Sequence, residues 1–217
     1  MDALAVLISG GLDSAILLGD ALRRLSVVHP VYIRCGLCWE STELVYLGRY
    51  LRALRCSALQ PLTILDQPVQ DLYGSHWSIT GKDVPGPNSP DEAVFLPGRN
   101  MLLLAKSLLW CHLHEAPNLA LGSLGTNPFP DASTTFFQGM ENLANQSVHG
   151  SVRICLPFAG MEKSAVMHLG KGLPLQYSFS CIKPNQERHC GQCNKCAERR
   201  HAFATAGMTD PTDYVSF

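Results

Sequence analysis

The stretch that decides the fold is Leu4-Ala5-Val6-Leu7-Ile8-Ser9-Gly10-Gly11-Leu12-Asp13-Ser14. Five apolar residues end at a serine and two glycines, and helical spacing of apolar residues then runs over 13–25. A short apolar run that stops at turn-forming residues is typical of a strand buried on both faces. The stretch therefore predicts a strand, a tight turn and a helix.

The same alternation of strand and helix continues along the chain. The predicted strands cover 4–8, 27–33, 58–65, 118–122 and 152–157, and the predicted helices cover 13–25, 41–54, 98–113, 133–147 and 162–169. Alternating strands and helices indicate a parallel sheet with right-handed crossovers. We therefore expect an α/β fold, with an open, mostly parallel five-stranded sheet and helices on both faces in a Rossmann-like arrangement.

Residues 67–95 interrupt this alternation. Their turn-forming residues are Pro68, Gly74, Gly81, Pro85, Gly86, Pro87 and Pro90. A helix or a central strand is unfavourable in such a stretch, because proline lacks the backbone N–H and glycine loses the most conformational freedom on ordering. We expect a functional lid or a disordered loop here.

Length and composition restrict the class of protein. The 217 residues suit one main domain, which we place at 1–175, with a C-terminal segment at 176–217. Apolar residues make up 46% of the chain and charged residues 16%, which predicts a compact core. The net charge of -1 creates no field that would gather nucleic acid or anionic lipid. We find no apolar run of about 18 residues and no secretory signal, so we expect a cytoplasmic protein without a membrane anchor.

The loop 9–14 has the composition of an anion-binding site. Two adjacent glycines allow the backbone to approach an oxyanion, and the serines at 9 and 14 add hydroxyl donors. The N-terminus of the following helix adds unpaired N–H groups and a partial positive charge. No lysine follows the glycines, and Gly-x-Gly-x-x-Gly is absent, so the loop is neither a Walker A loop nor a dinucleotide fingerprint. A capped turn without a ligand is the alternative.

The C-terminal segment carries four cysteines with the spacing of a metal site. Cys181, Cys190, Cys193 and Cys196 form a C-x8-C-x2-C-x2-C pattern. Four thiolates suit a closed tetrahedral site for structural Zn²⁺, with an iron–sulfur cluster as the main alternative and four unrelated thiols as another. A further C-x2-C pair, Cys35 and Cys38, has no second pair nearby, so we interpret it as two ordinary thiols.

Ser9-Gly10-Gly11-Leu12-Asp13-Ser14 resembles the pyrophosphate loop of the N-type ATP pyrophosphatases, whose fold is adenine nucleotide alpha hydrolase-like. Together with the four cysteines, Pro97-Gly98-Arg99-Asn100 and Lys163, it is similar to the 7-cyano-7-deazaguanine synthases of the queuosine pathway. Arg199 and Phe203 after the last cysteine have that family's spacing. The resemblance implies a ligase that converts 7-carboxy-7-deazaguanine, ammonia and ATP to the nitrile through an adenylated carboxylate and an activated amide. It also makes a homodimer plausible.

The resemblance assigns roles to individual residues. Residues predicted to bind ATP are Ser9, Gly10, Gly11, Leu12, Asp13, Ser14, Arg99, Asn100 and Lys163. Arg99 and Lys163 would neutralise the charge that develops on the leaving group. Asp13 would reach Mg²⁺ or its water shell.

Two loops depart from the family's usual pattern, and both are expected at the carboxyl edge of the sheet, where they would contact the acceptor. Cys35-Gly36-Leu37-Cys38-Trp39 stands where members usually carry Tyr-Gly-Gln-Arg-His, and 127–133 is a shortened loop. We expect the acceptor between 67–95 and 127–136, with Asp131 as the candidate to read a guanine-like edge. An N-cap of the next helix is the alternative role for Asp131. The alternative functions are adenylation of another carboxylate, attached to protein or RNA, and non-catalytic nucleotide binding.

Overall fold

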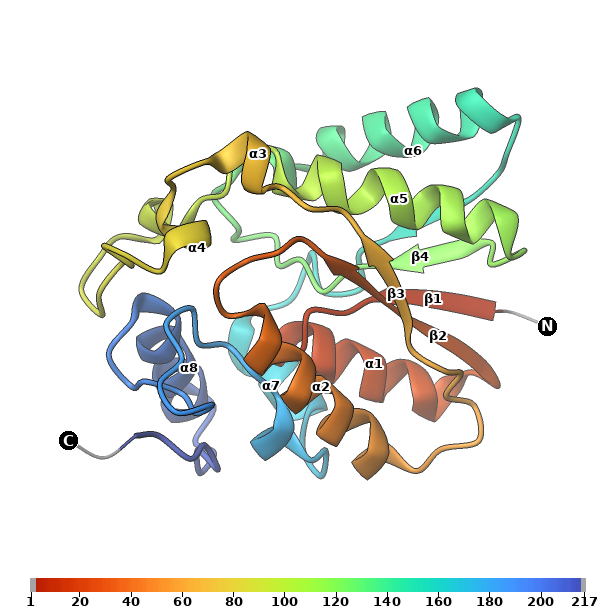
Figure 1. The fold of residues 1–217 in the computed structure, drawn as a ribbon. Coiled ribbons are helices and arrows are strands. Elements are labelled where there is room, and N and C mark those ends of the chain that lie inside the picture. Colours follow the sequence, from red (N-terminus) through yellow and green to blue (C-terminus); the bar gives the residue numbers. More distant parts are fainter. Residues whose placement is uncertain (1–2, 216–217) are drawn as a thin grey trace.

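The computed structural model describes residues 3–215, and its centre is one parallel sheet (Figure 1). The strands are β1 (Ala3–Leu7), β2 (Val27–Arg34), β3 (Thr63–Asp66), β4 (Asn118–Ala120) and β5 (Arg153–Cys155). Their order across the sheet is β3-β2-β1-β4-β5, and every pair is parallel, with Ala3 opposite Val27. The predicted α/β class and the five-stranded parallel sheet are confirmed.

Helices cover both faces of the sheet. In chain order they are α1 (Leu12–Arg24), α2 (Glu40–Leu54), α3 (Gln70–Tyr73), α4 (Trp77–Thr80), α5 (Arg99–Leu113), α6 (Thr134–Val148), α7 (Lys163–Leu169) and α8 (Asn194–Thr205). Figure 1 shows α5 and α6 on one face and α1, α2 and α7 on the other. Each face of the sheet has its own hydrophobic core. Because side chains alternate along a strand, Ala5 packs in the core on the α5 side of the sheet, while Val6 packs in the core on the α1 side.

One predicted strand begins later than the sequence suggested. Within 58–65, only Thr63–Asp66 forms β3. Ala58 and Gln60 do pair with the backbone of Val28 in β2, but the next β2 residue that faces this segment is Pro30, which has no N–H to continue the ladder. The apolar pattern therefore marked the pairing correctly and the strand limits incorrectly.

Residues 67–95 contain short helical elements, so the expectation that helix is unfavourable there was wrong for two single turns. These are α3 and α4, and a 3-10 turn follows at Asp91–Val94. Tertiary contacts hold the turns: Trp77 stacks on Trp39 with ring centroids 5.8 Å apart, and the Tyr73 hydroxyl donates to the Pro97 carbonyl at 2.9 Å. Such contacts overcome a poor local propensity.

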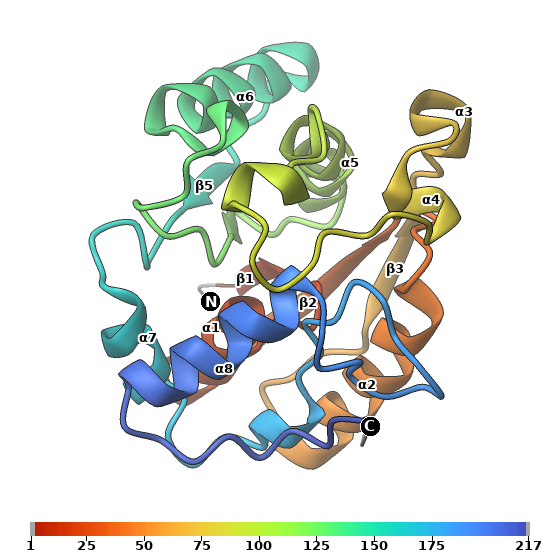
Figure 2. The ribbon, with the colours of Figure 1, turned by 90° about the vertical axis from the view of Figure 1, so that its left-hand side faces the viewer.

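The C-terminal segment packs on the main sheet domain beside α1 and α7 (Figure 2). Ala202 and Phe203 of α8 lie in the same hydrophobic core as Ile16 of α1. The Phe179 N–H donates to the Gly10 carbonyl at 2.7 Å, so this segment is tied directly to the loop after β1. Among residues 3–215, no helix is both long and apolar enough to cross a bilayer.

Candidate functional site

The loop that joins β1 to α1, residues 9–14 and hereafter the glycine loop, is held by its own serines. The Ser14 hydroxyl donates to the Gly11 carbonyl at 3.2 Å and lies 3.3 Å from the Ser9 hydroxyl. Gly10 has a φ of 83°, a left-handed conformation that side chains disfavour. Gly11 precedes α1 with no side-chain cap, so the first N–H groups of that helix are available to a ligand.

A cavity of about 320 Å³ opens at the glycine loop, and we call it the main cavity. It contains most residues that the sequence predicted to bind ATP: Ser9, Gly11, Leu12, Asp13, Ser14, Arg99, Asn100 and Lys163. Gly122, just after β4, also borders it, and a Cβ there would lie 3.0 Å from the carbonyl carbon of Asp13. The close approach of two backbones therefore favours glycine at 122.

Asp13 and Lys163 form an ion pair inside this cavity, although 150 residues separate them in the chain. The Lys163 ammonium lies 2.6 Å and 2.8 Å from the two carboxylate oxygens of Asp13. Both side chains are about one quarter exposed, at 26% and 27%. A partly exposed pair of this kind can be opened by a ligand at modest cost.

Arg99 begins α5 and faces the main cavity. Its Nε is buried and has no hydrogen-bond partner among the described residues. A buried donor without a partner costs free energy, so this atom fits an anion that would complete its hydrogen bonding. The cationic side chain also stands at a helix N-terminus, where the helix dipole favours negative charge.

Asp131 is tied to the start of α5. Its Oδ2 accepts a hydrogen bond from the Asn100 N–H at 2.9 Å, and its carbonyl accepts one from the Asn100 side chain at 2.8 Å. The alternative role as N-cap of the following helix is wrong, because Ser133 caps α6 by accepting from the Phe136 N–H. Asp131 is not among the described residues that line the main cavity, and its role in binding the acceptor stays a prediction.

The structure adds Glu43 to the cavity, a residue that sequence reasoning missed. Its side chain is buried, and its Oε1 accepts from the Tyr32 hydroxyl at 2.7 Å. Burial raises the pKa of the Glu43 carboxyl to about 7, although the hydrogen bond from Tyr32 and the charge of Arg99 lower it. Glu40 and Glu43 on one helix have the pattern of a solvated face, so their spacing carries no clear signal of a buried carboxylate.

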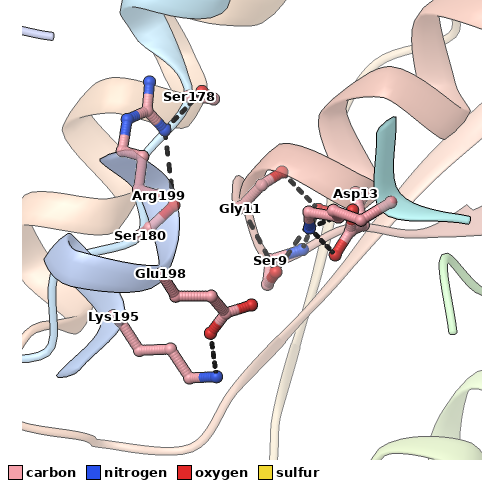
Figure 3. A network of polar contacts seen from close by, with 10 residues as sticks. Ser9, Gly11, Asp13, Ser178, Ser180, Lys195, Glu198 and Arg199 are labelled. Carbon is pink, nitrogen blue, oxygen red and sulfur yellow. Dashed lines mark hydrogen bonds and ion pairs between the residues drawn. The ribbon is translucent and has the colours of Figure 1, made fainter. Parts of the chain in front are cut away.

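Helix α8 contributes a second ion pair to the same cavity. Figure 3 shows Lys195 and Glu198 extending from α8 toward the glycine loop. Their charged atoms lie 2.5 Å apart. The pKa of Glu198 is lowered by the positive charges of Lys195 and Lys163, which outweigh its desolvation. The cysteine-rich segment therefore supplies charged groups to the cavity.

The four C-terminal cysteines meet in a buried cluster. Their sulfur atoms all lie within 4.8 Å of one another, with 4.0 Å between Cys190 and Cys196 and 3.9 Å between Cys193 and Cys181. In a tetrahedral site with zinc–sulfur bonds of about 2.3 Å, the sulfurs would be about 3.8 Å apart. Hydrogen bonds within the cluster lower the pKa of the Cys190 thiol and raise that of Cys196. The cluster can therefore hold a metal ion.

Cys35 and Cys38 do not join any metal-binding cluster of the described residues. Burial raises the pKa of the Cys35 thiol to about 11, and that of Cys38 is raised by the same cause. Both thiols are therefore protonated near neutral pH, which agrees with their interpretation as ordinary thiols.

Comparison with known families identifies the chain. The model of the family described as "Queuosine biosynthesis protein QueC" matches residues 3–207. The chain belongs to this family. QueC relatives named 7-cyano-7-deazaguanine synthase include one from Methylobacillus flagellatus, 33% identical over 97% of this chain and 95% of the relative. Another, from Thiobacillus denitrificans, is 30% identical over 97% of both chains.

Solved structures support the same fold for this QueC family member. A 4-thiouridine synthetase in complex with RNA and bound ATP matches 98% of this chain and 47% of its own, with a TM-score of 0.51 and 18% identity. A predicted tRNA methyltransferase subunit from Methanocaldococcus jannaschii matches 100% and 93%, with a TM-score of 0.50 and 17% identity. At such identities the likeness concerns the fold.

Proposed function

We propose that this protein is a cytoplasmic 7-cyano-7-deazaguanine synthase, an ATP-dependent carbon–nitrogen ligase. It would convert 7-carboxy-7-deazaguanine and ammonia to the nitrile. Membership of the QueC family and the printed names of its relatives support this reaction. The observation that carries it is the meeting of the glycine loop, Lys163 and the unpartnered Arg99 Nε in one cavity.

In this proposal the glycine loop and the N-terminus of α1 bind the phosphates of ATP. Arg99 and Lys163 neutralise charge on the pyrophosphate as the substrate carboxylate attacks the α-phosphorus. Asp13, which pairs with Lys163 in this structure, would hold Mg²⁺ or its water shell when Lys163 pairs with the phosphates instead. Ammonia then attacks the acyl carbon and AMP leaves. Activation of the amide oxygen by a second ATP, followed by loss of AMP and of the remaining amide protons, gives the nitrile.

We propose that the four cysteines of the C-terminal segment hold zinc in a structural role. Four cysteines leave no open coordination position for water, and the sulfur separations agree with a tetrahedral site. Because α8 follows the last ligands and carries Lys195 and Glu198, such a site would also fix the charged wall of the main cavity.

Asp131 and the Cys35–Trp39 loop bear on the identity of the acceptor. Asp131 keeps Oδ1 for a ring N–H, while its Oδ2 accepts from Asn100. A second candidate is adenylation of a different carboxylate, which the Cys35–Trp39 loop favours. In that loop Trp39 lines the main cavity where family members usually carry a histidine.

The direct test is to incubate the protein with ATP, ammonium and 7-carboxy-7-deazaguanine and to analyse the products by mass spectrometry. We expect the nitrile together with two AMP and two pyrophosphate per nitrile formed. Asp13→Ala and Ser14→Ala should impair turnover far more than folding. Release of ADP and phosphate with no adenylated intermediate would remove the assignment, and nucleotide binding without turnover of this acid would favour another carboxylate.

A further inference from the structure

Glu43 occupies a position that the proposed ATP chemistry does not use. It lies on the inner side of α2, 8% exposed, and lines the main cavity together with Asp13 and Lys163. It also touches the glycine loop, because a Cβ placed on Gly10 would lie 3.7 Å from the Glu43 Cγ. A buried carboxylate therefore faces the same space in which the acyl adenylate would form.

The two acids of α2 differ in how their carboxylates are satisfied. Glu40 accepts from the N–H groups of Cys35 and Gly36 at 2.7 Å and 2.6 Å, and it holds the turn after β2. Glu43 accepts from the hydroxyl of Tyr32. The titratable and charged groups that face it are Tyr32 on β2, Glu40 on α2 and Arg99 on α5. Burial, aided by the charge of Glu40, raises the pKa of Glu43 to about 7 against the lowering effects of Tyr32 and Arg99, and this value suits proton transfer near neutral pH.

The reaction needs such a group because ammonium has no lone pair to attack with. We propose that Glu43 is the general base that converts ammonium to ammonia within the main cavity. This inference rests on the proposed function. The Glu43 carboxylate takes one proton from ammonium, and the freed nitrogen lone pair forms the bond to the acyl carbon. The carbon–oxygen bond to AMP breaks and its electron pair leaves with AMP. The R–CO–NH3⁺ product and protonated Glu43 then release their protons to solvent.

Glu43→Gln separates this role from a structural one. The partial reaction that returns labelled pyrophosphate to ATP reports adenylation alone and should stay near the wild-type rate. Formation of amide or nitrile from ammonium at pH 7 should fall by about 10²-fold or more, the usual contribution of general-base catalysis. Hydroxylamine, a nucleophile that is largely uncharged at this pH, should give the hydroxamate at close to the wild-type rate. Raising the pH should restore the ammonium reaction.

The pH profile gives a second, independent test. Wild-type activity with ammonium should decrease as the pH falls through about 7, because Glu43 becomes protonated. The Tyr32 hydrogen bond lowers the pKa of Glu43, so Tyr32→Phe should move this acid limb to higher pH. The control Glu40→Gln should lower the melting temperature, because it weakens the turn at Cys35 and Gly36. The negative charge of Glu40 raises the pKa of Glu43, so its removal should move the acid limb to lower pH, opposite to the effect of Tyr32→Phe.

The outcomes distinguish this inference from the proposed function. If wild-type protein makes product and Glu43→Gln keeps its ammonium rate and pH profile, Glu43 is not the base. Equal loss of the ammonium, hydroxylamine and pyrophosphate-exchange reactions in Glu43→Gln would assign it a structural role and also overturn the inference. Failure of wild-type protein to form any product with ammonium would overturn the proposed function itself.

Discussion

Two arginines border the main cavity, Arg199 buried and Arg99 partly exposed, and they differ in how their donors are used. Arg199 is 1% exposed, and its guanidinium donates to the Thr212, Ser178 and Ser180 hydroxyls and to the Leu175 carbonyl. Arg99 keeps a buried Nε without a partner among the described residues. A satisfied arginine stabilises a fold, whereas an unsatisfied one retains hydrogen-bonding capacity for a ligand. The comparison therefore assigns Arg199 to holding the C-terminal segment in place and Arg99 to the ATP site proposed around the glycine loop.

Cys193→Ser should have the largest effect, because it tests the structural role of the four-cysteine cluster in the C-terminal segment. Loss of a structural metal site should remove most of a stability that is about 5 to 15 kcal/mol for proteins of this kind. We expect insoluble or metal-free protein, measured by soluble yield and by elemental analysis of the purified chain. Full solubility and activity without bound metal would contradict the assignment of the cysteine cluster.

Arg199→Met should be the next most damaging change. It leaves the Ser178 and Thr212 hydroxyls and the carboxylate of Asp210, 3.9 Å from the arginine Nε, without their charged partner. Breaking a buried charged network of this kind costs about 3 to 5 kcal/mol. The measurement is unfolding in denaturant. A matched control is Arg24→Met, which removes a mostly exposed guanidinium from an i,i+4 pair with the buried Asp20 and should cost less than Arg199→Met.

Arg99→Met should have the opposite profile. Turnover of ATP to AMP should fall by about 10² to 10³, as for loss of one preorganised donor to a developing charge. The melting temperature should stay near wild type, because the change removes a donor that is already unsatisfied. A large loss of stability with normal turnover would show that Arg99 has a structural role, as Arg199 does, and would remove the contrast between the two arginines.

Asp131→Asn should give the smallest effect, and it distinguishes a structural role of Asp131 at the start of α5 from a role in binding the acceptor. The amide can still accept from the Asn100 N–H, so we expect a cost of about 1 kcal/mol or less in the free energy of unfolding. If Asp131 also binds the acceptor, the KM for the acceptor should rise. An unchanged KM with a lower melting temperature would restrict this carboxylate to supporting the start of α5.

The fold and the principal motifs could be predicted because they depend on local patterns. Apolar runs, helical spacing and the glycine pair at 10 and 11 reflect backbone requirements that act over a few residues. The short helices α3 and α4 could not, since Trp39 and Pro97, which hold them, are distant in the chain. The late start of β3 depends on a missing N–H at Pro30 of the neighbouring strand, which the apolar pattern of 58–65 does not reveal.

By itself, the sequence determined the parallel sheet, the glycine loop after its first strand and a cysteine spacing suited to a metal. Only the tertiary structure decided which polar groups are buried and which partners they find. It paired Lys163 with Asp13 across 150 residues, tied Asp131 to Asn100 and buried Glu43 against Tyr32. The reason is physical: backbone propensity is local, whereas desolvation and hydrogen bonding of a side chain depend on every segment that packs around it.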